Sequence, residues 1–243
     1  MAERDKDSLK IKDAQKRLLR SFARVPGDFA LAGGTALELY YLHHRFSADL
    51  DFFSPKYNRR EIEEILRQFA KDTGAKAKFE AEFIARNMAR VRFYSVSLKG
   101  LARPIKVDFV QDTLFDKPRI KRFAAVPVYS IEHIYLQKIT AIIGTRELED
   151  DTGRPFMQGR DEARDAFDLY MLSKKIRPLH QFIKGLPRQM QRGMVHWYRT
   201  FSRHELILGL LDLDIYVKEF NSRKMIVYLE REIQGFVKEL AEE

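Results

Sequence analysis

Three aspartates are the residues of this chain whose types and spacing are best suited to chemistry. Asp49 and Asp51 flank a leucine in Ala-Asp-Leu-Asp-Phe-Phe, and Asp108 stands alone in Ile-Lys-Val-Asp-Phe-Val. Residues two apart on a strand point to the same side, so the first two carboxylates face one point. Like charges in apolar surroundings repel, and a divalent cation relieves the repulsion. The pair therefore predicts a metal site.

Asp108 completes that site if its strand lies beside the strand of the first pair. A lone aspartate between apolar neighbours is costly in a central strand without a partner. Three carboxylates could hold two Mg²⁺ or Mn²⁺ ions about 3.5–4 Å apart, and Asp108 could accept the proton of an attacking hydroxyl. The alternative is an ion pair between Asp108 and Arg92 or Arg103.

A glycine pair precedes the aspartates in the sequence. Gly33-Gly34-Thr35 follows a short apolar run and begins a segment of helix-forming residues. Glycine lets backbone N–H groups approach a ligand closely, and the start of a helix carries partial positive charge. The segment therefore predicts a phosphate-binding turn; a tight turn without a ligand is the alternative.

The elements that position these residues follow from hydrophobic periodicity. Helical spacing of apolar residues predicts helices at 8–24, 35–42, 58–73, 130–143 and 161–173. Strand patterns occur at 29–32, 49–53, 76–85, 90–99 and 104–110. The segment 144–160 is predicted to be a mobile loop.

These elements predict an α+β fold. A mixed β-sheet lobe, residues 1–128, is followed by an all-helical lobe, residues 129–243, which completes the active site.

Composition narrows the class of protein. The 243 residues include 44 Lys+Arg against 35 Asp+Glu, a net charge of +9 that favours a polyanionic partner. A basic protein without such a partner is the alternative. The absence of cysteine excludes disulfides, thiolate metal sites and cysteine nucleophiles. A charged N-terminus and the lack of a long apolar run predict a cytoplasmic protein with no membrane partner.

A second candidate surface lies in the C-terminal part of the chain. Arg188, Arg192 and Arg199 are interleaved with Trp197. Stacking side chains among arginines suit RNA, particularly an unpaired end. The alternative is a helix that Trp197 packs on the core, with solvated arginines outside.

The order and spacing of these elements resemble the polymerase-β-type nucleotidyltransferase superfamily. The string LAGGTALELYYLHHRFSADLDFF, which includes Arg45 and Ser47, more specifically resembles the AbiEii/AbiGii-like toxins of bacterial abortive-infection and type IV toxin–antitoxin systems. Members carry a lysine and then an Arg-Asp-x-x-Asp-Leu motif in a helical lobe. Lys138 and Arg164-Asp-Ala-Phe-Asp-Leu match them, so the resemblance spans about residues 29–173.

The resemblance implies a nucleotidyltransferase fold and a reaction. The protein is expected to transfer a nucleoside monophosphate from an NTP to an acceptor hydroxyl, with Mg²⁺ as cofactor and pyrophosphate as product. RNA, such as the 3′ end of tRNA, is the expected acceptor, and a cognate antitoxin is an expected partner. A protein or small-molecule acceptor, or a non-catalytic module that binds nucleotide or RNA, are the alternatives.

The resemblance also implies roles in the helical lobe. Lys138 is expected to contact nucleotide phosphates, and Asp165 to lie near the metals or to orient Lys138. Asp168 is expected to be a structural partner of Arg164 or Arg45. The segment 144–160 lengthens the gap before the second motif relative to the family pattern.

Overall fold

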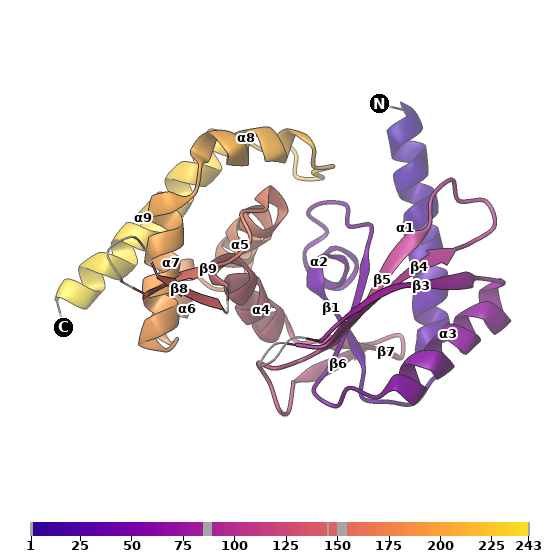
Figure 1. The fold of residues 1–243 in the computed structure, drawn as a ribbon. Helices are drawn as coiled ribbons and strands as arrows, with labels where there is room; N and C mark the ends of the chain where they lie inside the picture. The colour runs from indigo at the N-terminus through magenta and orange to yellow at the C-terminus, as the bar shows by residue number, and fades with distance from the viewer. Residues whose placement is uncertain (1, 85–88, 145, 150–154, 243) are drawn as a thin grey trace. The chain divides into compact units, whose positions relative to one another are not determined.

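The computed structural model describes residues 2–84, 89–144, 146–149 and 155–242. The chain divides into two compact units (Figure 1). One unit comprises Met1–Tyr41 with Phe46–Ile134, and the other comprises Leu42–Arg45 with Tyr135–Glu243. The lobe boundary after residue 128 stays a prediction.

The first unit is built on a sheet of seven strands. Its helical elements are α1 (Ala2–Phe22), α2 (Gly33–Ala36), the π-helix η1 (Leu37–Leu42, which ends in the other unit) and α3 (Arg59–Thr73). Its strands are β1 (Ala30–Ala32), β2 (Leu50–Ser54), β3 (Lys76–Phe83), β4 (Val91–Ser97), β5 (Ile105–Gln111), β6 (Ile120–Phe123) and β7 (Val126–Tyr129).

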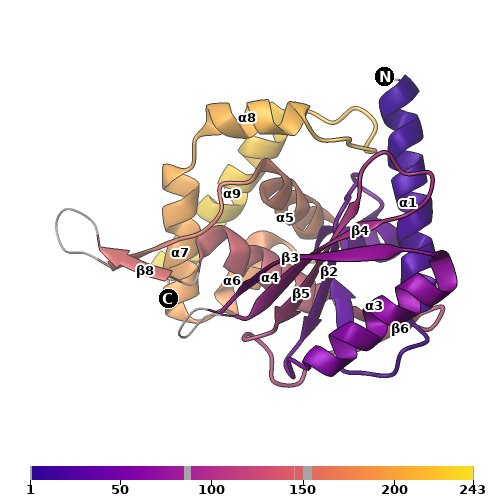
Figure 2. The same cartoon turned by 45° about the vertical axis from the view of Figure 1, so that its right-hand side comes forward.

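The strand order is β3-β4-β5-β2-β1-β7-β6. β2 runs parallel to β5, β1 runs parallel to β7, and the other neighbours are antiparallel. Figure 2 shows β2, β3, β4 and β5 side by side. The predicted α+β class with a mixed sheet is confirmed, and β2 and β5 are neighbours as the metal-site prediction required.

One face of the sheet forms an aromatic core with α1 and α3. The ring of Phe52 on β2 lies 4.4 Å from that of Phe22 on α1 and 6.5 Å from that of Phe69 on α3. Phe109 of β5 stacks on Phe52 at 5.4 Å. Successive strand residues point to opposite faces, so Asp51 points away from this core.

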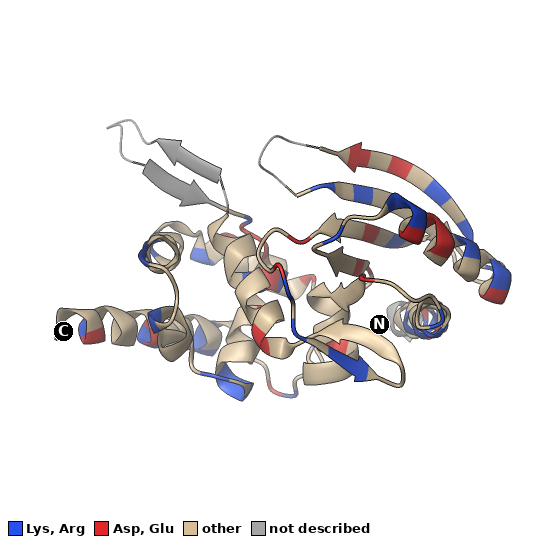
Figure 3. Ribbon diagram, turned by 90° about the horizontal axis from the view of Figure 1, so that it is seen from below, with Lys and Arg blue, Asp and Glu red and all other residues tan. Residues whose placement is uncertain are grey.

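The predicted helix over 58–73 is confirmed, with α3 at Arg59–Thr73. The Asn58 side chain accepts a hydrogen bond from the backbone N–H of Arg60, which satisfies one of the free donors at the start of the helix. Ile62, Ile65 and Phe69 are buried. At the edge of the sheet, β3 carries two lysines and then two glutamates, which alternate with apolar residues (Figure 3), and these charges disfavour edge-to-edge pairing.

β6 and β7 form a hairpin that the sequence analysis did not predict. Pro127 lies within β7, and a proline usually counts against a strand. The two turn residues, Ala124 and Ala125, have φ values of 44° and 72°. This type of hairpin turn usually carries Asn-Gly, so the sequence lacked the common turn signal.

The second unit is mainly helical. Its elements are α4 (Ile131–Ile143, which begins in the first unit), β8 (Arg146–Glu149), β9 (Pro155–Gln158), α5 (Ala163–Lys175), α6 (Leu179–Lys184), α7 (Arg188–Thr200), α8 (Arg203–Leu211) and α9 (Ser222–Ala241). No helix in the described part of the chain is long and apolar enough to cross a membrane.

The predicted helical C-terminal lobe is confirmed, but it also contains β8 and β9, in the segment 144–160 that was predicted to be a loop. These strands form an antiparallel pair with Glu147 opposite Met157 and Leu148 opposite Phe156. Neither segment alternates clearly, since β8 is Arg-Glu-Leu-Glu and β9 is Pro-Phe-Met-Gln, so the local sequence carried little strand signal. The parts of the predicted loop at 145 and 150–154 lie outside the described residues.

Candidate active site

The predicted acids lie on the face of the sheet opposite the aromatic core. Asp51 and Asp108 are register partners on the parallel strands β2 and β5. Asp49 immediately precedes β2, at the same alternation as Asp51. Asp108 is only 6% exposed, although its side chain is charged. Two carboxylates on adjacent strands repel each other, so this face requires a cation.

Lys106 supplies a positive charge at this face. Its Nζ lies 2.8 Å from Oδ2 of Asp108, two residues along β5. Burial lowers the pKa of Lys106, but the hydrogen bond to Asp108 and the charges of Asp108, Asp49 and Asp51 outweigh it and raise the pKa. The ammonium is therefore within electrostatic range of all three acids. The alternative partner Arg92 pairs with Glu82 instead, at 3.1 Å.

Gly33 brings the backbone against Asp51. Its φ is +69°, a conformation that favours glycine, and a Cβ there would collide with Oδ2 of Asp51. The absence of a Cβ at Gly33 therefore lets the carboxylate of Asp51, a predicted metal ligand, lie close to the backbone. Gly34 and Thr35, the rest of the predicted phosphate turn, are buried.

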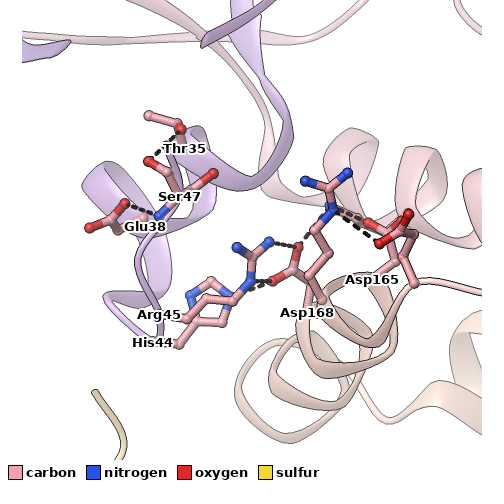
Figure 4. A network of polar contacts seen from close by, with 10 residues as sticks. Thr35, Glu38, His44, Arg45, Ser47, Asp165 and Asp168 are labelled. Carbon is pink, nitrogen blue, oxygen red and sulfur yellow. Dashed lines mark hydrogen bonds and ion pairs between the residues drawn. The ribbon is translucent and has the colours of Figure 1, made fainter. Parts of the chain in front are cut away.

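Three buried side chains hold the main chain just before β2. Thr35 Oγ1 donates hydrogen bonds to the carbonyls of Ser47 and Asp49. Gln15 Nε2 of α1 donates to the Ser47 carbonyl at 2.9 Å, and Glu38 of η1 accepts from the Ser47 N–H at 2.8 Å. Figure 4 shows Thr35 and Glu38 directed toward Ser47. The backbone leading to the Asp-Leu-Asp segment is thus fixed from three helical elements, α1, α2 and η1.

Gln15 and Glu38 were missed by the sequence analysis. Gln15 is fully buried within the apolar side of α1, and Glu38 is fully buried between two leucines of η1. A polar residue inside an apolar stripe is the signal that could have found both. The wider turn of the π-helix, a feature often found at functional sites, accompanies the placement of Glu38.

The donor set fits a hard divalent cation. Carboxylate oxygens are the ligands that Mg²⁺ prefers, and the Lys106 ammonium shows that a cation is stable beside Asp108. No three His, Cys, Asp or Glu side chains in the described ranges already form a metal cage. The assignment of Asp49, Asp51 and Asp108 as ligands therefore stays a prediction.

In the second unit, Asp168 is the centre of a buried ion network (Figure 4). Arg45 donates from Nε to Oδ1 and from Nη2 to Oδ2, both at 2.7 Å. His44 Nε2 and Lys138 Nζ each lie 2.7 Å from the same carboxylate. Burial raises the pKa of Asp168, but Arg45, Lys138 and the hydrogen bonds hold it well below its usual range. Of the two partners predicted for Asp168, Arg45 is the one observed.

Lys138 lies between two carboxylates in this network. Its Nζ contacts Asp165 Oδ1 at 2.7 Å as well as Asp168, and it is only 8% exposed. Burial lowers the pKa of Lys138, but the charges of Asp168 and Asp165 outweigh this effect, so the pKa is raised above its usual value. Asp165 thus contacts Lys138 within the second unit, whereas Arg164 lies 3.9 Å from Glu162.

The predicted RNA-binding residues separate into two groups. Arg188, Arg192 and Arg199 are exposed on α7 and line a groove with residues of α9. Trp197 is only 6% exposed and stacks on Phe201 at 4.8 Å. Trp197 therefore packs α7 on the core, as the alternative reading expected, and does not present a stacking surface.

Gly33→Ala tests the close approach to Asp51, with Gly74→Ala as its control. Both glycines have φ +69°, but a Cβ at Gly74 would meet nothing within 4 Å. We expect Gly74→Ala to reduce the free energy of unfolding by about 1 kcal/mol from backbone strain alone. Gly33→Ala should lose more, because Asp51 must also move. Equal losses in urea titrations would show that the contact with Asp51 is unimportant.

Asp168→Asn tests the buried network. Removing this charge leaves Arg45 and Lys138 undercompensated, so we expect a loss of about 3–5 kcal/mol in unfolding free energy. Asp165→Asn should cost less, because Lys138 keeps Asp168.

The contribution of Asp168 to the free energy of unfolding should decrease at acidic pH. Because the folded pKa of Asp168 is depressed, its contribution is present above the unfolded pKa of about 3.9 and is lost as pH falls below it. Asp168→Asn should therefore flatten the acid limb of urea stability measured against pH. An unchanged acid limb would contradict this account.

Comparisons with known proteins agree with the fold and the sequence pattern. The family described as "Nucleotidyl transferase AbiEii toxin, Type IV TA system" matches residues 17–235. No curated protein matches the chain significantly. A putative nucleotidyltransferase from H. pylori is 16% identical with a TM-score of 0.61, covering 97% of this chain and 96% of that one.

A second solved structure, JHP933 from Helicobacter pylori, is 18% identical with a TM-score of 0.59, covering 97% of this chain and 94% of that one. At these identities the two structures support the fold alone. The family match covers most of the chain, from within α1 to within α9. The chain belongs to the AbiEii nucleotidyltransferase toxin family of type IV toxin–antitoxin systems.

Proposed function

We propose that this nucleotidyltransferase transfers a nucleoside monophosphate from an NTP to a hydroxyl of RNA in a Mg²⁺-dependent reaction, as a type IV toxin. The observation that carries the metal-dependent step is the pairing of Asp51 with Asp108 on adjacent parallel strands. Asp49 precedes the same strand, and Gly33 lies against Asp51. The expected cytoplasmic location and the cognate antitoxin belong to the same proposal.

The chemistry follows from charge and geometry. The acceptor oxygen forms a bond to the α-phosphorus, the bond from that phosphorus to the bridging oxygen breaks, and pyrophosphate leaves. Asp108, one of the few buried acids in the first unit, accepts the proton of the acceptor hydroxyl. Asp49, Asp51 and one oxygen of Asp108 would bind Mg²⁺, which supplies positive charge to the reacting phosphate when it is bound.

The turn at Gly33 to Thr35 is proposed to lie beside the triphosphate. The Thr35 hydroxyl in this turn does not face the triphosphate in this proposal, because it binds the carbonyls of Ser47 and Asp49. We therefore assign Thr35 to positioning the Asp-Leu-Asp segment. Lys138 contacts Asp165 and Asp168 in the structure. We propose that it also contacts the phosphates when the nucleotide is bound.

Labelled NTPs, Mg²⁺ and total RNA test the reaction. The wild-type protein should transfer label to RNA, and Asp51→Asn should lower the rate by at least about 10²-fold, because a metal ligand is lost. Glu63→Gln, at an exposed carboxylate of α3, is the control and should keep the rate. Equal labelling by Asp51→Asn and the wild type would show that Asp51 does not take part in the reaction.

The same assay separates the alternatives. Label that appears on protein or on a small molecule, but not on RNA, would identify a different acceptor for the same site. NTP binding that requires Mg²⁺ without transfer to any acceptor would support a non-catalytic module.

An exposed face of α7 is the proposed contact for the RNA. Arg188 and Arg192 are one helical turn apart, and Arg199 lies two further turns along. None of the three forms an ion pair with an acidic residue in the described part of the chain. Unpaired guanidinium groups on one groove suit phosphates and unstacked bases.

Replacing Arg188 and Arg192 with glutamine tests this contact. The double variant should bind RNA more weakly, and its slope of log affinity against log salt should fall by about 1.4, because two phosphate contacts are lost. The charge-matched control replaces Arg60 and Arg67 on α3, which are also exposed. Identical slopes for the two double variants, measured by fluorescence anisotropy, would rule out a specific role for α7.

A further inference from the structure

Lys106 lies between an acid and an aromatic ring on the face that carries the proposed metal ligands. Its Nζ is 2.8 Å from Asp108 Oδ2 and 5.1 Å from the centre of the Phe93 ring. Phe93 is the register partner of Asp108 on β4, so the ring and the carboxylate share one face of the sheet. The ammonium therefore has two favourable neighbours within reach of one lysine stem.

The position of this ammonium matters because three negative charges gather there. Asp51 lies opposite Asp108 on β2, and Lys106 interacts electrostatically with Asp49 as well as with these two. The Lys106 ammonium offsets part of that charge. A divalent ion that binds the same acids must also overcome repulsion from the ammonium, since like charges a few ångströms apart interact strongly.

Lys106 is able to leave the carboxylate. Its side chain is 52% exposed, and the lysine stem has four rotatable carbons. The Phe93 ring offers the ammonium a second contact that does not involve Asp108. A move from the acid to the ring keeps the positive charge beside the site while it frees an oxygen of Asp108.

We propose that Lys106 is a resident counter-ion of the three aspartates, which leaves Asp108 when a divalent metal ion binds and stays on the Phe93 ring. This inference rests on the proposed function, because it takes Asp49, Asp51 and Asp108 as the metal ligands. It assigns Lys106 a positioning role. Without metal, the ammonium stabilises the acids; when a metal ion binds, the ammonium competes with it for Asp108 and so lowers the affinity for the ion.

Mn²⁺ affinity measured by calorimetry at neutral pH tests the proposal. Lys106→Met should bind Mn²⁺ about tenfold more tightly than the wild type, because a competing positive charge is gone. Lys106→Arg keeps the charge and should resemble the wild type. Lys78→Met is the matched control, because Lys78 also pairs with an acid two residues along its strand, Glu80, at 2.9 Å. Its Mn²⁺ affinity should not change.

Thermal unfolding gives a second readout that does not depend on activity. In a chelator, Lys106→Met should melt below the wild type, because Asp108 loses its ion pair with the Lys106 ammonium. Saturating Mn²⁺ should remove or reverse that difference, whereas any difference for Lys78→Met should be the same with and without Mn²⁺.

The outcomes separate this inference from the proposed function. If the wild type binds Mn²⁺ and Lys106→Met binds it equally or more weakly, the counter-ion role is wrong and the metal site stands. If no variant binds Mn²⁺ and Mn²⁺ changes no melting temperature, the metal assignment and the counter-ion role both fail.

Discussion

The repulsion between carboxylates on two neighbouring strands is the constraint on which the first unit depends. Asp51 and Asp108 face each other across β2 and β5, with Asp49 just before β2. A fold without a use for these charges would gain stability by replacing them with apolar residues. Here Lys106 offsets part of the charge, and Gly33 leaves room for the Asp51 carboxylate. The surrounding structure therefore accommodates the acids, which is the arrangement expected of a site that binds a cation.

Main-chain contacts help to place the acids. Gln15, Thr35 and Glu38 hold the carbonyl and N–H groups that lead into β2. These three side chains come from α1, α2 and η1, so several elements fix one short segment. Such support limits the movement of the side chains that this segment carries. In the second unit, Asp168 holds Arg45 in a comparable way.

Much of the fold and of the acid cluster was predictable because local patterns encode them. Alternation placed the strand that carries Asp51, and an Asn58 cap with an apolar stripe placed α3. The β6–β7 hairpin escaped because its turn is Ala124–Ala125 and its second strand contains a proline. Lys106 was missed although it lies two residues from Asp108 on one strand, because a lysine on a strand usually lies in solvent. Its proximity to Asp51 follows only from the sheet register. Contacts between distant segments have no local signature.

Metal-dependent nucleotide binding tests the central claim most directly. Calorimetry would compare the affinity for a non-hydrolysable NTP analogue in Mn²⁺ and in a chelator, for the wild type and for a variant with both Asp51→Asn and Asp108→Asn. The account predicts at least about tenfold tighter binding with Mn²⁺ in the wild type and no such gain in the variant. Equal affinity with and without Mn²⁺ in the wild type, or a full gain in the variant, would contradict it.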